Sequence, residues 1–154
     1  MAKILDRRRL VPNLHLIEIQ APDVAKKCQP GQFVIVMPDE RGERIPLSIA
    51  DWDPKKGSVT SVFLVIGTST QKLSLLKPGD EVPVFVGPLG KPSEIGNFGT
   101  VLLAGGCFGI GALFPIARAL KRAGNTVLTL LDAKARYLIY WEDRLRSVSD
   151  KLFF

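Results

Sequence analysis

Arg44-Ile45-Pro46-Leu47-Ser48 is followed by three glycine-containing segments, and the order of these pieces predicts the fold of the chain. The segments are Gly67-Thr68-Ser69-Thr70, then Gly87-Pro88-Leu89-Gly90, then the loop 105–111, which reads Gly-Gly-Cys-Phe-Gly-Ile-Gly. Each piece alone is a weak signal, because short glycine motifs occur in many proteins. Their order is informative, because the first three pieces lie among predicted strands and the last opens a predicted helix.

The first part of the chain has the pattern of a small antiparallel β-barrel or sandwich. Turns that contain proline or glycine separate its apolar and β-branched runs, which are 14–19, 32–37, 45–50, 58–66 and 81–86. Strands at such short spacing are typical of barrels and sandwiches. Two helical segments are expected between them, a single turn over 24–27 and a short helix over 71–76 capped by Ser69 or Thr70.

The pattern changes near residue 97 to alternating strands and helices. Continuous apolar runs, typical of buried parallel strands, alternate with segments whose apolar residues recur at helical spacing. The expected order is strand, helix, strand, helix, strand, over 100–104, 110–120, 127–131, 138–148 and 151–154. This order is the front half of a doubly wound nucleotide-binding fold. We therefore expect two domains, residues 1–97 and 98–154.

Composition and charge narrow the function classes. Hydrophobic residues make up 46% of the chain, enough for a packed core, and the net charge is +6. Arg7-Arg8-Arg9 is the one dense basic run and has no aromatic residues between its charges, so a solvated basic surface is favoured over nucleic-acid binding. Attraction to dinucleotide phosphates or to an acidic redox partner is a second interpretation. No apolar run is long enough for a membrane span and no secretion signal is visible, so a cytoplasmic location is expected.

Taken together, these motifs resemble the ferredoxin-NADP reductase superfamily. Within it, the sequence is similar to the electron-transfer subunits of dihydroorotate dehydrogenase, sulfide dehydrogenase and NADH-dependent ferredoxin:NADP oxidoreductase. The resemblance implies an FAD-binding ferredoxin-reductase-type barrel followed by a Rossmann-like NAD(P)-binding domain. It also implies an oxidoreductase that passes reducing equivalents between NAD(P)H and a partner redox protein or catalytic subunit. An alternative is a non-catalytic or truncated flavin-binding or structural subunit that needs a partner.

The pentapeptide supplies the first candidate flavin contacts. The resemblance assigns Arg44 to the flavin pyrophosphate, Leu47 to the isoalloxazine ring and Ser48 to the region of its N5 atom. The planar fork of an arginine suits phosphate, and Pro46 fixes the local backbone so that Leu47 and Ser48 face opposite ways. The structural alternative is an exposed arginine on an edge strand, next to a buried leucine and a surface serine.

Two further glycine segments add weaker candidates. Gly67 and Thr70 match a Gly-x-x-Thr-x-x-Leu pattern, which assigns Thr70 to the pyrophosphate and Gly67 to close backbone approach. Thr70 would equally serve as an ordinary helix cap. The resemblance places Gly87 and Gly90 in a turn beside the nicotinamide side of the flavin, although the same residues fit a simple turn.

The glycine loop is the candidate nicotinamide-nucleotide motif. Gly105, Gly106 and Gly109 match the pattern Gly-Gly-Gly-x-Gly-x-Ala-Pro, in which backbone and helix N-terminus receive a pyrophosphate. The sequence departs from that pattern at positions 107, 111 and 112. A small buried thiol is the favoured interpretation of Cys107, and a group near the nicotinamide is the alternative.

The preference for NAD or NADP stays open. Asp132 ends a predicted strand, where an acidic residue binds the ribose of NAD in the general dinucleotide fold. Lys134 and Arg136 offer positive charge for the 2′-phosphate of NADP instead. We identify no catalytic acid or base, since hydride transfer depends on positioning, and His15 is expected to be structural.

Cysteine content and length lead to two further expectations. Cys28 and Cys107 cannot supply the four ligands of an iron–sulfur cluster, so no cluster is expected in this chain, although longer relatives carry one on a C-terminal segment. Residues 98–154 correspond to about half of a nucleotide domain. A sheet of that extent leaves an edge and apolar surface exposed, so we expect a homodimer or a partner subunit that covers them.

Overall fold

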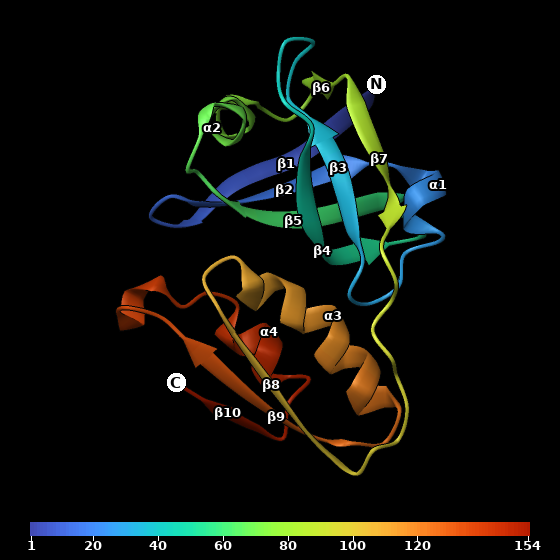
Figure 1. Cartoon of the computed structure of the whole chain (residues 1–154), viewed down its shortest axis with the longest axis vertical. Helices are drawn as coiled ribbons and strands as arrows, with labels where there is room; N and C mark the ends of the chain where they lie inside the picture. The colour runs from blue at the N-terminus through green and yellow to red at the C-terminus, as the bar shows by residue number, and fades with distance from the viewer.

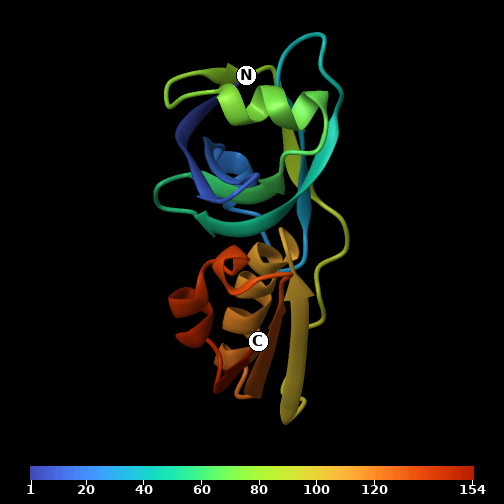
Figure 2. The same cartoon turned by 90° about the vertical axis from the view of Figure 1, so that its left-hand side faces the viewer.

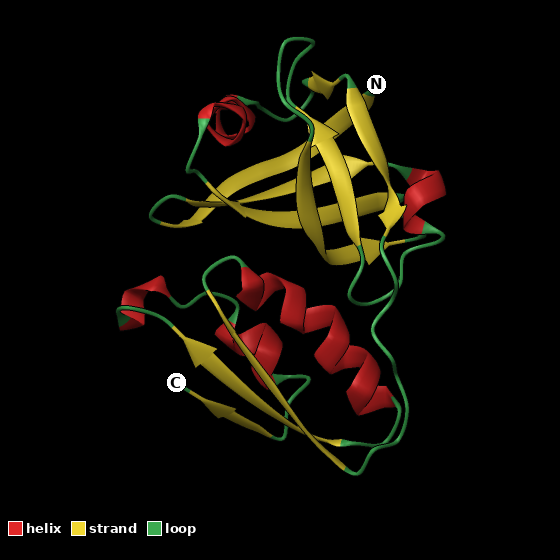
Figure 3. Ribbon diagram, viewed as in Figure 1, coloured by secondary structure: helices red, strands yellow, loops and turns green.

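The computed structural model describes all residues, 1–154, as a β-barrel above a smaller α/β unit (Figure 1). Seven antiparallel strands follow the order β6-β1-β2-β5-β4-β3-β7. The strands at the two ends of this order, β6 and β7, follow one another directly in the chain and therefore lie close together. The sheet accordingly curls into a nearly closed barrel (Figure 3). This confirms the predicted barrel. Its strands are β1 Ala2–Val11, β2 Leu14–Gln20, β3 Phe33–Met37, β4 Ile45–Asp53, β5 Ser58–Leu64, β6 Glu81–Val82 and β7 Val84–Leu89.

Two features of the barrel differ from the sequence prediction. Strand β1 was not predicted, because Arg7–Arg9 masks its alternation; it pairs with β2 along most of its length. The predicted strand 81–86 is two strands, since Pro83 separates β6 on one edge of the sheet from β7 on the other.

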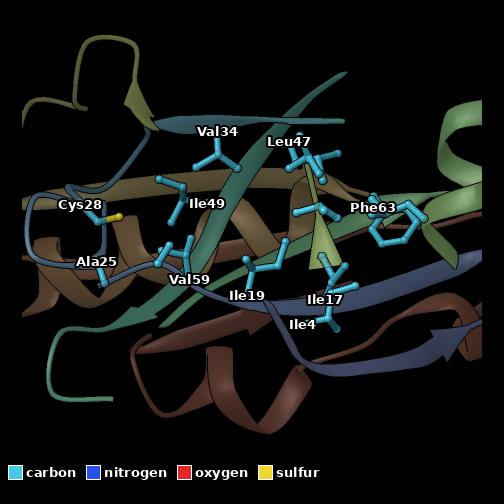
Figure 4. Close-up of a cluster of buried hydrophobic side chains, with 14 residues drawn as sticks. Ile4, Ile17, Ile19, Ala25, Cys28, Val34, Leu47, Ile49, Val59 and Phe63 are labelled. Carbon is cyan, nitrogen blue, oxygen red and sulfur yellow. The ribbon is translucent and has the colours of Figure 1, made fainter. Parts of the chain in front are cut away.

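The barrel core is filled by inward-facing side chains from every wall (Figure 4). On β4, residues 45, 47 and 49 face this core, whereas residues 46, 48 and 50 face outward, as strand alternation requires. Two helices close gaps in the wall: α1 Pro22–Ala25 and α2 Thr68–Leu75. The buried side chain of Leu73 fixes α2 to the core.

The second unit is a three-stranded parallel sheet in the order β10-β9-β8. Its strands are β8 Thr100–Gly106, β9 Thr126–Asp132 and β10 Lys151–Phe153, and α3 Gly109–Arg122 covers one face (Figure 2). The register places Leu102, Leu130 and Phe153 on the opposite face, where they are exposed; Leu102 is 63% exposed. This arrangement confirms the predicted parallel sheet and leaves one of its faces apolar.

The helix predicted over 138–148 is wrong in extent. The structure has a 3₁₀ turn at Arg136–Leu138 and a short helix, α4 Glu142–Arg146. Trp141 adopts a left-handed conformation with φ of 56°, which prevents a continuous helix through this position. Within α4, Glu142 and Arg146 form an ion pair one helical turn apart, with Oε1 and Nη2 at 2.8 Å.

The barrel and the α/β unit share one apolar interface. Val62 and Ala50 of the barrel pack with Ile110 and Phe114 of α3 in a single buried cluster. An ideal Cβ at Gly111 would lie 3.1 Å from Cγ2 of Val62, so a glycine here lets α3 approach the barrel wall closely.

A charged network supports the same interface from the barrel side. Asp51 on β4 pairs with Arg118 of α3 at 2.9 Å and with Arg144 of α4. The two guanidinium groups also lie over aromatic rings, Arg118 over Trp52 and Arg144 over Phe114.

Residues 90–99 connect the two sheets without helix or strand, and we propose the domain boundary at residue 97 within this connection. No helix combines the length and the apolar character needed to cross a bilayer.

His15 on β2 should make the stability of the barrel pH-dependent. Its buried Nδ1 has no hydrogen-bond partner, and its ring stacks on Phe63. Burial lowers the pKa of His15, and the charges of Arg7 and Arg9 lower it further. The unfolded chain therefore takes up the proton first, so the free energy of unfolding should fall as pH drops below about 6.5 towards the folded pKa.

Urea denaturation at pH 7.5 and pH 5.5 would measure this effect. His15 is the only histidine in the chain, so His15→Phe should remove most of the difference between the two pH values. An equal difference in the variant and in the unsubstituted protein would assign the pH dependence to other groups.

Candidate functional site

A cavity of about 150 Å³ lies where β4, the end of β5 and the start of α2 meet. The side chains of Pro46, Leu47 and Ser48 line one wall, and Thr70 lies at another. The structure thus brings together most of the predicted flavin contacts. Leu47 is only 7% exposed, because it also belongs to the barrel core, so Pro46 and Ser48 present more of their surface outward.

Arg44 lies beside the N-terminus of α2 although the sequence separates the two by more than twenty residues. The backbone N–H of Glu43 donates to Oγ of Ser69 at 3.2 Å, which fixes the residue before Arg44 to the first turn of α2. The Arg44 side chain is exposed and makes no ion pair. A free guanidinium and the free N–H groups of a helix N-terminus are each suited to bind an anion.

Thr70 caps the start of α2, but not in the predicted way. The helix begins earlier than expected, with Gly67 as the N-cap residue. Oγ1 of Thr70 accepts from the N–H groups of Ile66 and Gly67 at 3.1 and 3.0 Å. An ideal Cβ at Gly67 would meet no atom within 4 Å, so the space beside this backbone is open. The capping role of Thr70 is therefore shown, and its contact with a pyrophosphate stays a prediction.

A second cavity, of about 550 Å³, lies at the carboxyl ends of β8 and β9. Gly106 and Cys107 line it from the glycine loop, Asp132 lines it from the end of β9, and Lys134 lines it from the loop that follows. The turn between β1 and β2 forms the barrel side of the wall. Ligands of open α/β sheets bind at this edge of the strands, so the cavity is the candidate nucleotide site.

The predicted glycines have different surroundings. An ideal Cβ at Gly106 would lie 2.7 Å from the backbone oxygen of Asp132, and one at Gly105 would lie 3.0 Å from Leu113, so both allow close packing. Gly109 begins α3 and faces open space. Gly87 and Gly90 lie against Val34 and Phe33 of β3 and line neither cavity. Their contact with a cofactor stays a prediction, as does that of Gly105 and Gly109.

Cys107 is exposed, so the favoured interpretation of a buried thiol is wrong. The glycine loop turns outward at this residue, which has a φ of 52°, and its side chain lines the larger cavity. Cys28 is the buried thiol instead, and burial raises its pKa to about 11.

Only two of the three residues considered for the preference between NAD and NADP line the larger cavity. Asp132 and Lys134 line the larger cavity. Arg136 does not line it; its guanidinium pairs with Glu142 and lies over the ring of Phe154. The positive charge near Asp132 is therefore that of Lys134.

The two cavities meet at one place. Leu64 at the end of β5 lines both, and the consecutive residues Cys107 and Phe108 line one each. Phe108 is 49% exposed and faces the smaller cavity. The sequence analysis did not single out Phe108 or Leu64, because their roles depend on the contact between the barrel and the α/β unit.

Comparisons with known proteins agree with this architecture. The chain is 44% identical over 150 residues to the dihydroorotate dehydrogenase B (NAD(+)) electron transfer subunit homolog of Thermotoga maritima, covering 97% of this chain and 53% of that protein. It superimposes on a chain of the NADH-dependent reduced ferredoxin-NADP oxidoreductase structure with a TM-score of 0.95 and 43% identity, covering 99% of this chain and 56% of that one. The chain belongs to the ferredoxin-NADP reductase superfamily.

More distant members of this superfamily share the fold. The dihydroorotate dehydrogenase B electron transfer subunit of Shouchella clausii is 35% identical over 133 residues, covering 82% of this chain and 51% of that protein. Ferredoxin-NADP+ reductase from Plasmodium falciparum has a TM-score of 0.80 at 15% identity, covering 99% of this chain and 69% of that one, which supports the fold alone. This reductase-family chain spans about half the length of the curated relatives that it matches. A search of family profiles finds no match.

Proposed function

We propose that this chain is the flavin- and nicotinamide-binding part of an electron-transfer oxidoreductase, and that it moves reducing equivalents between NAD(P)H and a partner redox protein through FAD. One observation carries the proposal. The cavity with the predicted flavin contacts and the cavity at the sheet edge adjoin at Leu64, Cys107 and Phe108. Two ligands that exchange a hydride must lie in contact, and this is where their reacting ends would meet.

The residues that line the smaller cavity, together with Arg44 next to it in the chain, have the chemistry that FAD requires. Arg44 and the N-terminus of α2 offer positive charge for its pyrophosphate. Pro46, Leu47 and Phe108 offer apolar and aromatic surface for its ring, and the Ser48 hydroxyl is a hydrogen-bonding group among them. When bound, FAD supplies the hydride acceptor and donates the electrons onward. The chain itself binds and orients the two ligands and excludes water from between them, since no side chain has to move a proton.

The visible absorption spectrum before and after addition of NADH or NADPH tests this proposal. We expect stoichiometric flavin bands that bleach with at least one of the two nucleotides. Flavin bands that persist under excess NADH and NADPH would contradict electron transfer and favour the alternative of a flavin-binding subunit. A protein that binds no added FAD would contradict both.

We further propose that the partner subunit, or a second copy of the chain, packs on the apolar outer face of the parallel sheet. This face presents Leu102, Leu130 and Phe153 side by side, and exposed apolar surface of this kind favours association. Sedimentation at micromolar concentration should show self-association or, with the redox partner added, a complex. Leu102→Lys, which places a charge at the most exposed of these three side chains on the edge strand β8, should weaken that association. A monodisperse monomer that binds no redox partner would contradict this proposal.

A further inference from the structure

The hydroxyl of Tyr140 is the one side-chain group that bonds to the glycine loop from outside it. Tyr140 is 6% exposed and lies between η1 Arg136–Leu138 and α4. The N–H of Gly111 donates to its oxygen at 2.8 Å. The same hydroxyl lies 3.1 Å from the carbonyl oxygen of Cys107 and 3.2 Å from that of Phe108, and it donates its hydrogen to this pair. Burial raises the pKa of the phenol well above its ordinary value, so the hydroxyl keeps its proton.

These contacts act on a strained part of the loop. Cys107 has a φ of 52°, a region that costs a residue with a Cβ atom free energy unless its surroundings hold it there. A single hydroxyl reaches the residue in that conformation, the residue after it and the first turn of α3. Removing it would leave the Gly111 N–H buried without a partner.

The same residues form the junction of the two cavities. Cys107 lines the larger cavity and Phe108 lines the smaller one. Gly111 lies against Val62, which is a further wall residue of the smaller cavity. The hydroxyl of Tyr140 therefore connects the backbone of both cavity walls at the point where they meet.

We propose that Tyr140 is a positioning residue, whose hydroxyl fixes the turn at Cys107 and Phe108 and thereby sets how a nicotinamide in one cavity meets a flavin in the other. The inference rests on the proposed function, because the relative placement of the cavities matters only if ligands in them react. Hydride transfer is sensitive to such placement, and displacements of about 1 Å change rates by about a hundredfold.

Tyr140→Phe is the test, because it removes the hydroxyl and keeps the ring in the apolar interface. Amide hydrogen exchange of the ligand-free protein, followed by mass spectrometry, should be about tenfold faster over residues 107–111. With FAD bound, the limiting rate of flavin reduction by NADH should fall about tenfold or more, while FAD content and the NADH concentration for half-maximal reduction change less than about twofold.

Thr129→Val is the matched control. Thr129 is fully buried in β9, and its Oγ1 bonds to Ser149 at 2.7 Å, away from both cavities. The control also removes a buried hydroxyl, so it should lower stability without changing exchange over 107–111 or the rate of flavin reduction.

Unchanged exchange over 107–111 in Tyr140→Phe would overturn the proposal. An equal slowing of flavin reduction in Thr129→Val would also overturn it, and so would a slowing that lost FAD fully explains. In either case the role of Tyr140 would be structural. If the unsubstituted protein binds no FAD or does not bleach, the proposed function fails, and with it the role in hydride transfer. The exchange result is independent of that failure, since it requires no ligand.

Discussion

Replacing Arg44 with alanine should weaken FAD binding about ten- to a hundredfold, the largest single effect that we expect on the cofactor. A charge-assisted hydrogen bond contributes about 1.5–3 kcal/mol, and each 1.4 kcal/mol changes an affinity tenfold. Arg44 is free to make such a bond, because its exposed side chain has no ion-pair partner and the residue before it is bonded to the first turn of α2. Titration of the flavin-free protein with FAD, followed by fluorescence, would measure the change.

Arg41→Ala is the control for this experiment. Arg41 lies in the same loop, carries the same charge and is also exposed, but it does not directly precede the strand that lines the cavity. Its replacement should change FAD affinity less than about threefold, through long-range electrostatics alone. Equal losses in the two variants would assign the effect to net charge, and no loss in either would remove Arg44 from the binding site.

Replacing Gly111 with leucine should have the largest effect on stability. An ideal Cβ at this position already lies 3.1 Å from Val62 and 3.3 Å from Ala50, so the added atoms of leucine have no room unless α3 moves away from the barrel. Overpacking of this kind lowers the free energy of unfolding by about 1–3 kcal/mol. Urea denaturation followed by tryptophan fluorescence is a suitable measurement, because Trp52 and Trp141 flank this interface.

Gly109→Ala, in the same helix, should not lower the stability of the protein. An added Cβ at Gly109 would meet no atom within 4 Å, and alanine is the better helix former. This variant should be unchanged or more stable by up to about 1 kcal/mol. If Gly111→Leu were as stable as Gly109→Ala, the close approach of α3 to the barrel would be wrong.

Local sequence signals predicted most of the fold. The alternation of β2, β3 and β5 and the continuous apolar runs of β8 and β9 each follow from the side chains of one element. Strand β1 was not predicted, because three consecutive arginines interrupt its alternation of apolar and polar residues. The second helix was overextended because the spacing of Leu138, Trp141 and Leu145 is helical, whereas the backbone at Trp141 is left-handed.

The candidate site could be predicted only in part, because it is assembled from contacts between distant segments. Pro46, Ser48 and Thr70 carry local motifs, and the structure brings them to one cavity. Tyr140 carries no motif, since its role depends on reaching a loop about thirty residues earlier in the chain. The exposure of Cys107 was misjudged for a related reason, because burial statistics of free cysteine do not account for a strained turn at a cavity wall.

Leu64 is the common wall of the two cavities, and this has a thermodynamic consequence. Each ligand that arrives removes water from one side of the same half-buried side chain, so part of the desolvation that the second ligand requires is complete once the first is bound. The two occupancies are then linked. If flavin and nucleotide occupy the two cavities as proposed, this linkage is reciprocal: the factor by which bound flavin tightens the nucleotide is also the factor by which bound nucleotide tightens the flavin.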